Sequence, residues 1–376
     1  MKYFAAKELV ELAGIILCKL KIGKKKHYDL VIVKVDGIGD YIMWHDCVSA
    51  YIEKYGGRKV LYICNSPVQE LAEQEDFFTE VVSFNEMKMK KSPLYTFQFL
   101  NSLKRIKADT VITPVRERHW YGDIFAMAIS SKNRLSIRPI SKPRYFTNYY
   151  NKSYSRLIDC SKCVNEIEAN IQFTKEAILA SYKYGNNPLI IHTQMKLPDC
   201  QYAVISFSTS ALRKNWPLER FITVIDHIPD EYKIVLIGHG EWDQEQAMII
   251  EAKVKDKERI INYVGKTTVP EMISVISKAD FVIGNDSAAV HIAAAVHVPS
   301  IAIVPGPHFY RFLPYPENMH FEFAPRIVAF KMDCYNCNFN CIYPQKEPVE
   351  CLDRISSDMV LSEMNSMLKD LTQKDC

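Results

Sequence analysis

The sequence predicts an α/β protein with two Rossmann-like domains, each built on a parallel sheet. Three observations lead to this fold class. The chain has 376 residues, which is too long for one ordinary core and suits two domains. Apolar strand patterns alternate with helical patterns in two separate series. A stretch without this alternation lies between the two series.

The first element is an apolar stretch at residues 9–18, which a run of lysines follows. We expect a helix over residues 5–20. It either packs on its own domain or lies in the interface of an anionic membrane, because apolar residues flanked by lysines suit lipid headgroups. No run in the sequence reaches the roughly 18 to 20 apolar residues that span a bilayer.

The first series defines an N-terminal Rossmann-like domain, residues 1–160. Its strands are predicted at residues 29–35, 59–65, 80–85, 109–115 and 133–137. Helical patterns are predicted at residues 41–55 and 92–107. Residues 161–200 form a linker region with a helical pattern at 163–184.

The second series defines a C-terminal Rossmann-like domain, residues 201–355. Its strands are predicted at residues 202–208, 233–238, 259–265, 280–285 and 300–304. The helices between and after them are predicted at residues 217–228, 241–254, 269–279 and 287–296. Residues 356–376 form a tail with a last helix. Ligands of such sheets bind outside the carboxyl ends of the strands, so the loops there are the candidate sites.

A glycine-containing turn follows the first strand of the first domain. The segment DGIGD, residues 36–40, opens a helix, and its glycines allow a tight turn with close backbone approach. Ile42 stands where the dinucleotide fingerprint has its third glycine, and no suitable acid follows the second strand. These two facts argue against a nicotinamide-dependent oxidoreductase. Asp40 is either an N-cap or a general base.

Polar residues also follow the first two strands of the second domain. Ser208 and Thr209 come after the first strand, and Arg213 and Lys214 precede the next helix. Hydroxyls and cations beside a helix start suit phosphate oxygens, although the two cations could equally be solvated loop charges. Glu241 follows the second strand, where it either starts a helix or accepts hydrogen bonds from a ribose.

The polar turn NDS, residues 285–287, lies between a buried strand and a helix of small residues. Asp286 can cap this helix, whose positive end stabilises an anion next to Ser287. Ser287 and His291 are four residues apart and share one helix face. The turn therefore predicts a further part of a phosphate site.

Three segments together resemble glycosyltransferase family 9, the heptosyltransferase family. They are VKVDGIGD, LRKNWPLERF and GKTTVPEMISVISKADFVIGNDSAAVHIAAAVHVPSIAIV, in the family's order. The resemblance covers most of residues 30–355 and is strongest in residues 264–306. It implies a GT-B fold, in which the parallel sheets of two Rossmann-like domains face a central cleft. It also implies an inverting transfer with no metal or other cofactor in catalysis.

The resemblance further implies roles for individual residues. Asp40 matches the catalytic base, and Lys214 matches the lysine that meets the donor phosphates. The expected donor-binding residues are Gly39, Ser208, Thr209, Lys214, Glu241, Asn285, Asp286, Ser287, Ala288 and His291. Ala288 replaces the usual glycine, which makes the phosphate site tighter. Asp36 replaces a common small residue, and we expect Asp36 and Arg116 to contact the acceptor.

The expected activity is transfer of a heptose or similar sugar from a nucleotide-sugar donor, with ADP-heptose as the leading candidate. The acceptor is a glycolipid or glycan: lipopolysaccharide core by default, with O-antigen, capsule or a protein as alternatives. Displacement at an anomeric carbon needs a base and stabilisation of the leaving nucleoside diphosphate, which Asp40 and Lys214 can supply. The alternative is a non-catalytic nucleotide-sugar or glycan-binding protein of the same fold.

Charge and cysteine usage restrict the compartment and the partners. The net charge of +3 gives no argument for a nucleic-acid partner. Eleven cysteines without a signal peptide indicate a reducing compartment, the cytoplasm, with the N-terminal helix as a candidate peripheral contact on the inner membrane. Four of the cysteines cluster within residues 334–351. These are Cys334, Cys337, Cys341 and Cys351, whose spacing suits a structural zinc or iron ion or a lobe packed with reduced thiols.

Overall fold

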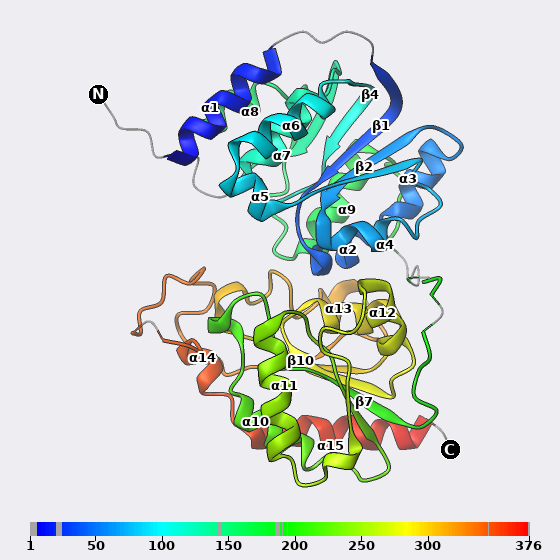
Figure 1. The fold of residues 1–376 in the computed structure, drawn as a ribbon, viewed down its shortest axis with the longest axis vertical. Helices are drawn as coiled ribbons and strands as arrows, with labels where there is room; N and C mark the ends of the chain where they lie inside the picture. The colour runs from blue at the N-terminus through cyan, green and yellow to red at the C-terminus, as the bar shows by residue number, and fades with distance from the viewer. Residues whose placement is uncertain are drawn as a thin grey trace. The chain divides into compact units, whose positions relative to one another are not determined.

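The computed structural model of the chain divides into two compact units, Met1–Gly185 and Asn186–Cys376. It describes residues 6–19, 25–140, 144–184, 189, 191–193, 195–319, 321–344 and 346–374. Each unit is a parallel sheet covered by helices on both faces (Figure 1). We describe each unit by itself.

The sheet of the first unit has six parallel strands in the order β3-β2-β1-β4-β5-β6. The strands are β1 (Lys26–Lys34), β2 (Val60–Asn65), β3 (Glu80–Phe84), β4 (Ile106–Thr113), β5 (Asn133–Ile137) and β6 (Arg156–Ile158). The strand order reverses between β1 and β4, which is the doubly wound Rossmann arrangement. Leu30, Val31, Ile32 and Val33 in β1 are fully buried, as expected of a strand covered on both faces.

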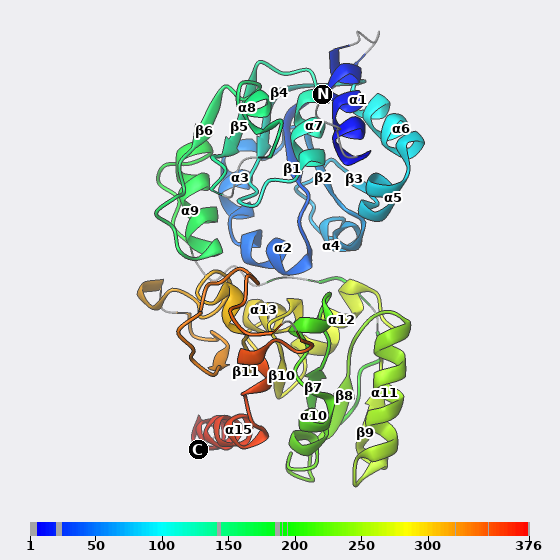
Figure 2. The same ribbon diagram turned by 90° about the vertical axis from the view of Figure 1, so that its left-hand side faces the viewer.

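The helices of the first unit fall into two groups on opposite faces of the sheet. They are α1 (Ala6–Lys19), α2 (Ile38–His45), α3 (Val48–Tyr55), α4 (Gln69–Ala72), α5 (Glu86–Lys91), α6 (Pro93–Leu103), α7 (Trp120–Ala128), α8 (Thr147–Asn151) and α9 (Glu166–Ala177). Helices α1, α6 and α7 contact one another, and α2 contacts α9 (Figures 1 and 2).

Helix α1 packs on its own domain. It lies against α6 and α7 and buries Ile15, while the buried carboxylate of Glu11 accepts a 2.8 Å hydrogen bond from Tyr150. Gly14 allows the close approach to α7, because a Cβ atom there would lie 2.9 Å from Ile124. Residues 5 and 20 of the expected helix lie outside the described residues. Within the described ranges, no helix is long and apolar enough to cross a membrane.

The sheet of the second unit repeats the first topology. Its six parallel strands have the order β12-β11-β10-β7-β8-β9, so the switch point lies between β7 and β10. The strands are β7 (Tyr202–Ser206), β8 (Lys233–Leu236), β9 (Ile260–Asn262), β10 (Phe281–Asn285), β11 (Ser300–Ile303) and β12 (Arg326–Val328).

The helices of the second unit enclose a core that extends to the end of the chain. They are α10 (Leu218–Ile225), α11 (Glu241–Lys253), α12 (Val269–Ser277), α13 (Ala288–Ala295), α14 (Glu350–Asp353) and α15 (Ser357–Lys374). Helix α15 lies against α10 and the strands β11 and β12 (Figure 2). Its side chains Val360, Met364 and Met367 are buried in the same apolar cluster as the strands.

The predicted fold class of two Rossmann-like parallel sheets is confirmed. Each of the ten expected strands is present, and the structure adds β6 and β12, which have three residues each. The helix expected over residues 41–55 is two helices, α2 and α3, which are separated by a turn at Asp46 and Cys47. Helix α7 follows β4 directly and was not predicted.

Candidate functional site

The predicted site residues lie at the carboxyl ends of the strands that flank the two switch points. In the first unit, residues 36–40 follow β1 and Arg116 follows β4. In the second unit, residues 208–214 follow β7 and residues 286–291 follow β10. These are the positions where doubly wound sheets bind ligands.

Asp40 is the third residue of α2 (Ile38–His45) and lies in its first turn. The N-cap of α2 is Gly37, and the Asp40 carboxylate accepts a 3.3 Å hydrogen bond from the Gly37 backbone N–H. The interpretation of Asp40 as the N-cap itself is therefore wrong. Gly37 has φ −89° and ψ −175°, an extended conformation that does not itself require a glycine. Gly39 is the second residue of the helix.

Lys34, the last residue of β1, and Asp36, in the connection to α2, form a buried ion pair. The distance from Lys34 Nζ to Asp36 Oδ2 is 2.9 Å, and the two side chains are 3% and 13% exposed. The second carboxylate oxygen, Oδ1, is buried and has no hydrogen-bond partner among the residues that the structure describes. Burial raises the pKa of Asp36 to about 7, against the opposing effect of Lys34, and the charges of Asp40 and Glu166 raise it further. This carboxyl group can hold or release a proton near neutral pH.

Arg116 is buried beside the start of α9. Its Nη1 atom donates a 3.0 Å hydrogen bond to the carbonyl of Val164, and its Nη2 atom donates to the carbonyl of Cys163. An ion pair of 3.8 Å joins it to Glu166, and both side chains are less than a tenth exposed. The structure thus shows the guanidinium holding the segment before α9, a role that the sequence did not suggest.

Asn285 ties three segments of the second unit together. Its buried side chain accepts a 3.0 Å hydrogen bond from the Trp216 backbone N–H and donates a 2.7 Å hydrogen bond to the Phe207 carbonyl. Asn215 makes a similar link, because its Oδ1 atom accepts from the N–H and the hydroxyl of Thr209. The loop between β7 and α10 is therefore fixed to the end of β10.

Lys214, Asp286 and His291 form a charged group at the end of β10. Lys214 ends a 3₁₀ turn, Leu212–Lys214, and its Nζ atom lies 3.9 Å from Asp286 Oδ2. His291 Nε2 lies 3.9 Å from Asp286 Oδ1, and its Nδ1 atom is 2.8 Å from the Tyr315 hydroxyl. A separation of 3.9 Å is too long for a hydrogen bond, so the Lys214 donors can still bind an anion.

The N-terminus of α13 differs from the sequence prediction in one respect. The N-cap is Ser287, in extended conformation and without a side-chain cap, and the first helical residue is Ala288. The prediction that Asp286 caps the helix is therefore wrong, since its carboxylate faces Lys214 and His291 instead. The Ser287 hydroxyl lies 3.4 Å from the Ser206 hydroxyl at the end of β7. The backbone N–H groups at this helix start remain available to an anion.

Asp243 is a site residue that the sequence analysis missed. Its buried carboxylate accepts hydrogen bonds of 2.6 Å from the Ser208 hydroxyl and 2.7 Å from the His239 N–H. Glu241 starts α11 and is exposed, after Gly240, whose φ of 99° requires a glycine. The sequence feature that could have indicated Asp243 is a second acidic residue, after Glu241, in the first turn of α11. Acidic side chains at this position are stabilised by the positive end of the helix.

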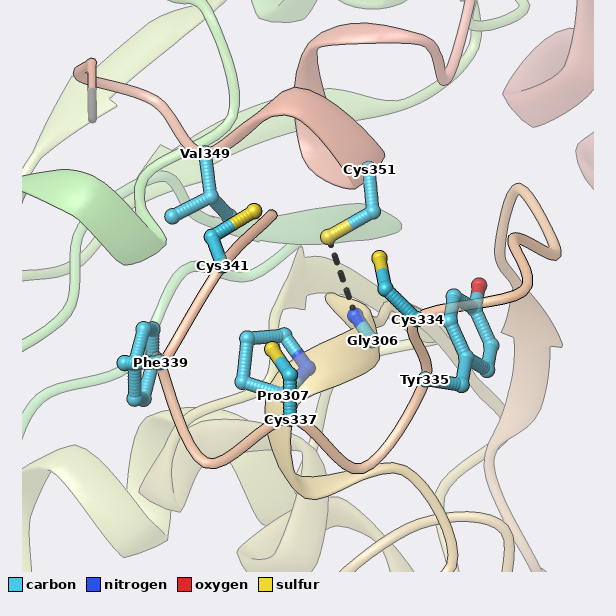
Figure 3. A pocket seen from close by; sticks show the side chains of 9 residues that line it. All are labelled: Gly306, Pro307, Cys334, Tyr335, Cys337, Phe339, Cys341, Val349 and Cys351. Carbon is cyan, nitrogen blue, oxygen red and sulfur yellow. Dashed lines mark hydrogen bonds between the residues drawn. The ribbon is translucent and has the colours of Figure 1, made fainter. Parts of the chain in front are cut away.

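The cysteine cluster lines a small pocket in the second unit. Figure 3 shows the side chains of Cys334, Cys337, Cys341 and Cys351 around it, together with Gly306, whose N–H donates to Cys351 Sγ at 3.2 Å. Burial raises the pKa of the Cys334 and Cys351 thiols, so both are neutral at pH 7. Across the described ranges, no three His, Cys, Asp or Glu side chains are arranged as metal ligands. The expected ligand geometry is therefore not formed by these thiols as they stand.

Comparison with known proteins identifies the family. Residues 167–320 match the family model of Glycosyltransferase family 9 (heptosyltransferase). Lipooligosaccharide heptosyltransferase 2 of Campylobacter jejuni is 25% identical over 248 residues, which cover 65% of this chain and 74% of that protein.

Solved structures share the fold at lower identity. E. coli heptosyltransferase WaaC with ADP-2-deoxy-2-fluoro heptose is 17% identical, with a TM-score of 0.65 and coverage of 91% of this chain and 99% of that chain. The iron-containing dodecameric glycosyltransferase TibC of enterotoxigenic E. coli is 14% identical, with a TM-score of 0.51 and coverage of 93% and 78%. The match over residues 167–320 is thus to glycosyltransferase family 9, the heptosyltransferase family, and the chain has the GT-B-like fold of the solved heptosyltransferases.

Proposed function

We propose that this protein transfers a heptose from ADP-heptose to a hydroxyl group of a lipopolysaccharide-core or other surface glycan, with inversion at the anomeric carbon. The single observation that carries the proposal is the group of Lys214, Asp286 and His291 beside the start of α13. It offers a cation and backbone N–H groups to a diphosphate at the switch point of a Rossmann-like sheet. The C. jejuni relative is named as a heptosyltransferase, and WaaC was solved with an ADP-heptose analogue, which supports this donor.

The donor half of the reaction belongs to the second unit. The bond between the anomeric carbon and the diphosphate breaks, and negative charge develops on the leaving phosphate. Lys214 donates charge-assisted hydrogen bonds to it, and the N–H groups at the start of α13 stabilise the same charge. In this mechanism these groups do the work that a metal ion does elsewhere, so catalysis requires no metal. Ser208, held by Asp243, and the exposed Glu241 are placed to meet the ribose side of the donor.

The acceptor half belongs to the first unit. Asp40 removes the proton from the acceptor hydroxyl as that oxygen attacks the anomeric carbon. Its hydrogen bond to Gly37 fixes the carboxylate at the start of α2. The unpartnered Oδ1 atom of Asp36 is suited to accept a hydrogen bond from a second acceptor hydroxyl. Arg116 supports the acceptor side indirectly, because its hydrogen bonds and ion pair fix the position of residues 163–166.

A structural metal ion is a further part of the proposal. Four thiols around one pocket match zinc or iron in number and in chemistry, and TibC is described as iron-containing. The bound ion would deprotonate the thiols and draw them together, since the present arrangement does not converge. Such an ion would hold the lobe of residues 334–351 and take no part in the transfer.

The proposed compartment is the cytoplasm, with peripheral contact at the inner membrane where a glycolipid acceptor would lie. The ten cysteines within the described ranges are free thiols, which supports a reducing compartment. No part of the proposal involves nucleic acid.

The test is incubation of the purified protein with a panel of nucleotide sugars and acceptor glycans, with mass spectrometry of the products. We expect release of ADP from ADP-heptose that depends on the acceptor, and a glycan product heavier by one heptose. Release of a different nucleotide would correct the donor. Tight binding of a nucleotide sugar without turnover, with every acceptor tried, would favour the non-catalytic binding protein.

A further inference from the structure

Two cysteines outside the pocket, Cys160 and Cys163, lie together in a turn between β6 and α9. The Cys163 N–H donates a 3.1 Å hydrogen bond to the Cys160 carbonyl, which closes a four-residue turn. Such a turn keeps its end Cα atoms within about 7 Å, and disulfides join Cα atoms about 4.4 to 6.8 Å apart. The turn therefore holds the two residues at a separation that a disulfide can bridge without moving the sheet.

The two thiols have different surroundings. Cys160 is 1% exposed, and its Sγ atom lies 3.7 Å from the Ala169 carbonyl oxygen, whereas Cys163 is partly exposed. The thiols also contact each other, and the hydrogen bond from Cys160 lowers the pKa of Cys163, with Arg116 adding positive charge. Cys163 is thus the accessible and nucleophilic member, and Cys160 is the protected one.

We propose that Cys160 and Cys163 form a thiol–disulfide exchange site that reacts with the disulfides of small thiols. The Cys163 thiolate attacks one sulfur of the disulfide, and a mixed disulfide forms as the first small thiolate leaves. The Cys160 thiol then attacks Cys163 Sγ, and the second small thiolate leaves with the Cys160 proton. In total, two protein thiols are oxidised to one disulfide, and one small disulfide is reduced to two thiols.

The site lies next to a residue of the proposed acceptor half. The Cys163 carbonyl accepts a hydrogen bond from Arg116, and Glu166, which pairs with Arg116, follows in the same segment. Oxidation of the pair therefore acts on the segment that Arg116 holds. Thiol–disulfide exchange does not require sugar transfer, so the test of the exchange site is independent of the test of the proposed function.

The test uses the full chain, oxidised glutathione and peptide mapping, and the sequence provides a sharp readout. Trypsin cuts after Arg156, Lys162 and Lys175, so Cys160 and Cys163 fall in the separate peptides 157–162 and 163–175. Oxidation followed by alkylation should leave these two peptides joined by a disulfide. The exposed Cys200 is the internal control, which should carry a glutathione adduct and react about fivefold more slowly than Cys163 at pH 7.

Two variants separate the steps. Cys160→Ser should accumulate the glutathione adduct on peptide 163–175. Cys163→Ser should show no joined peptides and no glutathione adduct on either of the two peptides. In the parent chain, the glutathione adduct on Cys163 should appear before the Cys160–Cys163 disulfide. This time course tests the order of the two steps even if a variant unfolds. A parent chain that keeps the adduct and never joins the peptides would overturn the proposal. Reaction at Cys163 no faster than at Cys200 would overturn it as well.

Discussion

Replacing Asp40 by Asn separates a structural role from a catalytic one. Within the described part of the chain, the Asp40 carboxylate makes one hydrogen bond, which it accepts from Gly37 N–H at 3.3 Å. The side-chain oxygen of Asn can accept the same hydrogen bond. The loss of a negative charge near the start of α2 costs about 0.3 to 1 kcal/mol of folding stability. Stability should therefore change little.

Turnover should change much more. An amide cannot accept the proton of the acceptor hydroxyl, so we expect kcat to fall by about 10² to 10⁴, which equals about 2.7 to 5.5 kcal/mol of transition-state free energy. The affinity for ADP should stay near that of the parent. Glu271→Gln is a matched control, because Glu271 is also the third residue of its helix and accepts from the cap residue Thr268. An Asp40→Asn variant that keeps more than about a tenth of the parental kcat would refute the base assignment.

Three further predictions concern the donor site, the buried acid and the cysteine pocket. Lys214→Ala should weaken ADP binding by about 1.5 to 3 kcal/mol with little effect on folding; unchanged binding in calorimetry would make Lys214 a surface charge. The Asp36 carboxyl has a pKa raised from 3.8 to about 7, so its contribution to stability is complete below pH 3.8 and is lost as the pH rises through about 7. Denaturant unfolding at several pH values should show that the free energy of unfolding of the parent falls between about pH 4 and pH 7, and that it falls less in Asp36→Asn. An equal pH dependence of the free energy of unfolding in the two proteins would contradict this prediction. Protein purified without chelator should contain about one equivalent of zinc or iron, and Cys351→Ser should lower it; less than about a tenth of an equivalent in the parent would contradict the metal site.

The fold was predictable because its strands are continuous apolar runs bounded by turns. Buried parallel strands such as β1 and β10 have this pattern, and each expected strand was found. The missed strands β6 and β12 have three residues each, too few for any pattern to repeat. Helix α7 was missed because it follows β4 after a short loop and is apolar on nearly every side, with no amphipathic period to reveal it.

The candidate site was predictable in its residue types and their loops, because the polar residues follow buried strands. Their partners were not predictable. Asp286 was expected to cap α13, but its carboxylate lies 3.9 Å from both Lys214 Nζ and His291 Nε2, an arrangement that depends on the fold. The pairing of Asp243 with Ser208 joins loops 35 residues apart, and no local pattern reports such a contact. By contrast, Cys160 and Cys163 are only three residues apart, so their spacing was a local signal that the sequence already contained.

The side-chain amide of Asn285 restrains the loop between β7 and α10. Its two hydrogen bonds connect the backbone after β7 and the backbone before α10 to the last residue of β10, at the centre of the sheet. The Trp216 amide proton points at a fully buried oxygen, so it can exchange with solvent only when this junction opens. Such an opening breaks contacts to a central strand, which belongs to the most stable part of a domain. The Trp216 amide should therefore exchange hydrogen for deuterium as slowly as the strand amides, although it lies in a loop. The loop that presents Lys214 is then anchored to the sheet at both of its ends, which keeps the proposed nucleotide site in place before any ligand binds.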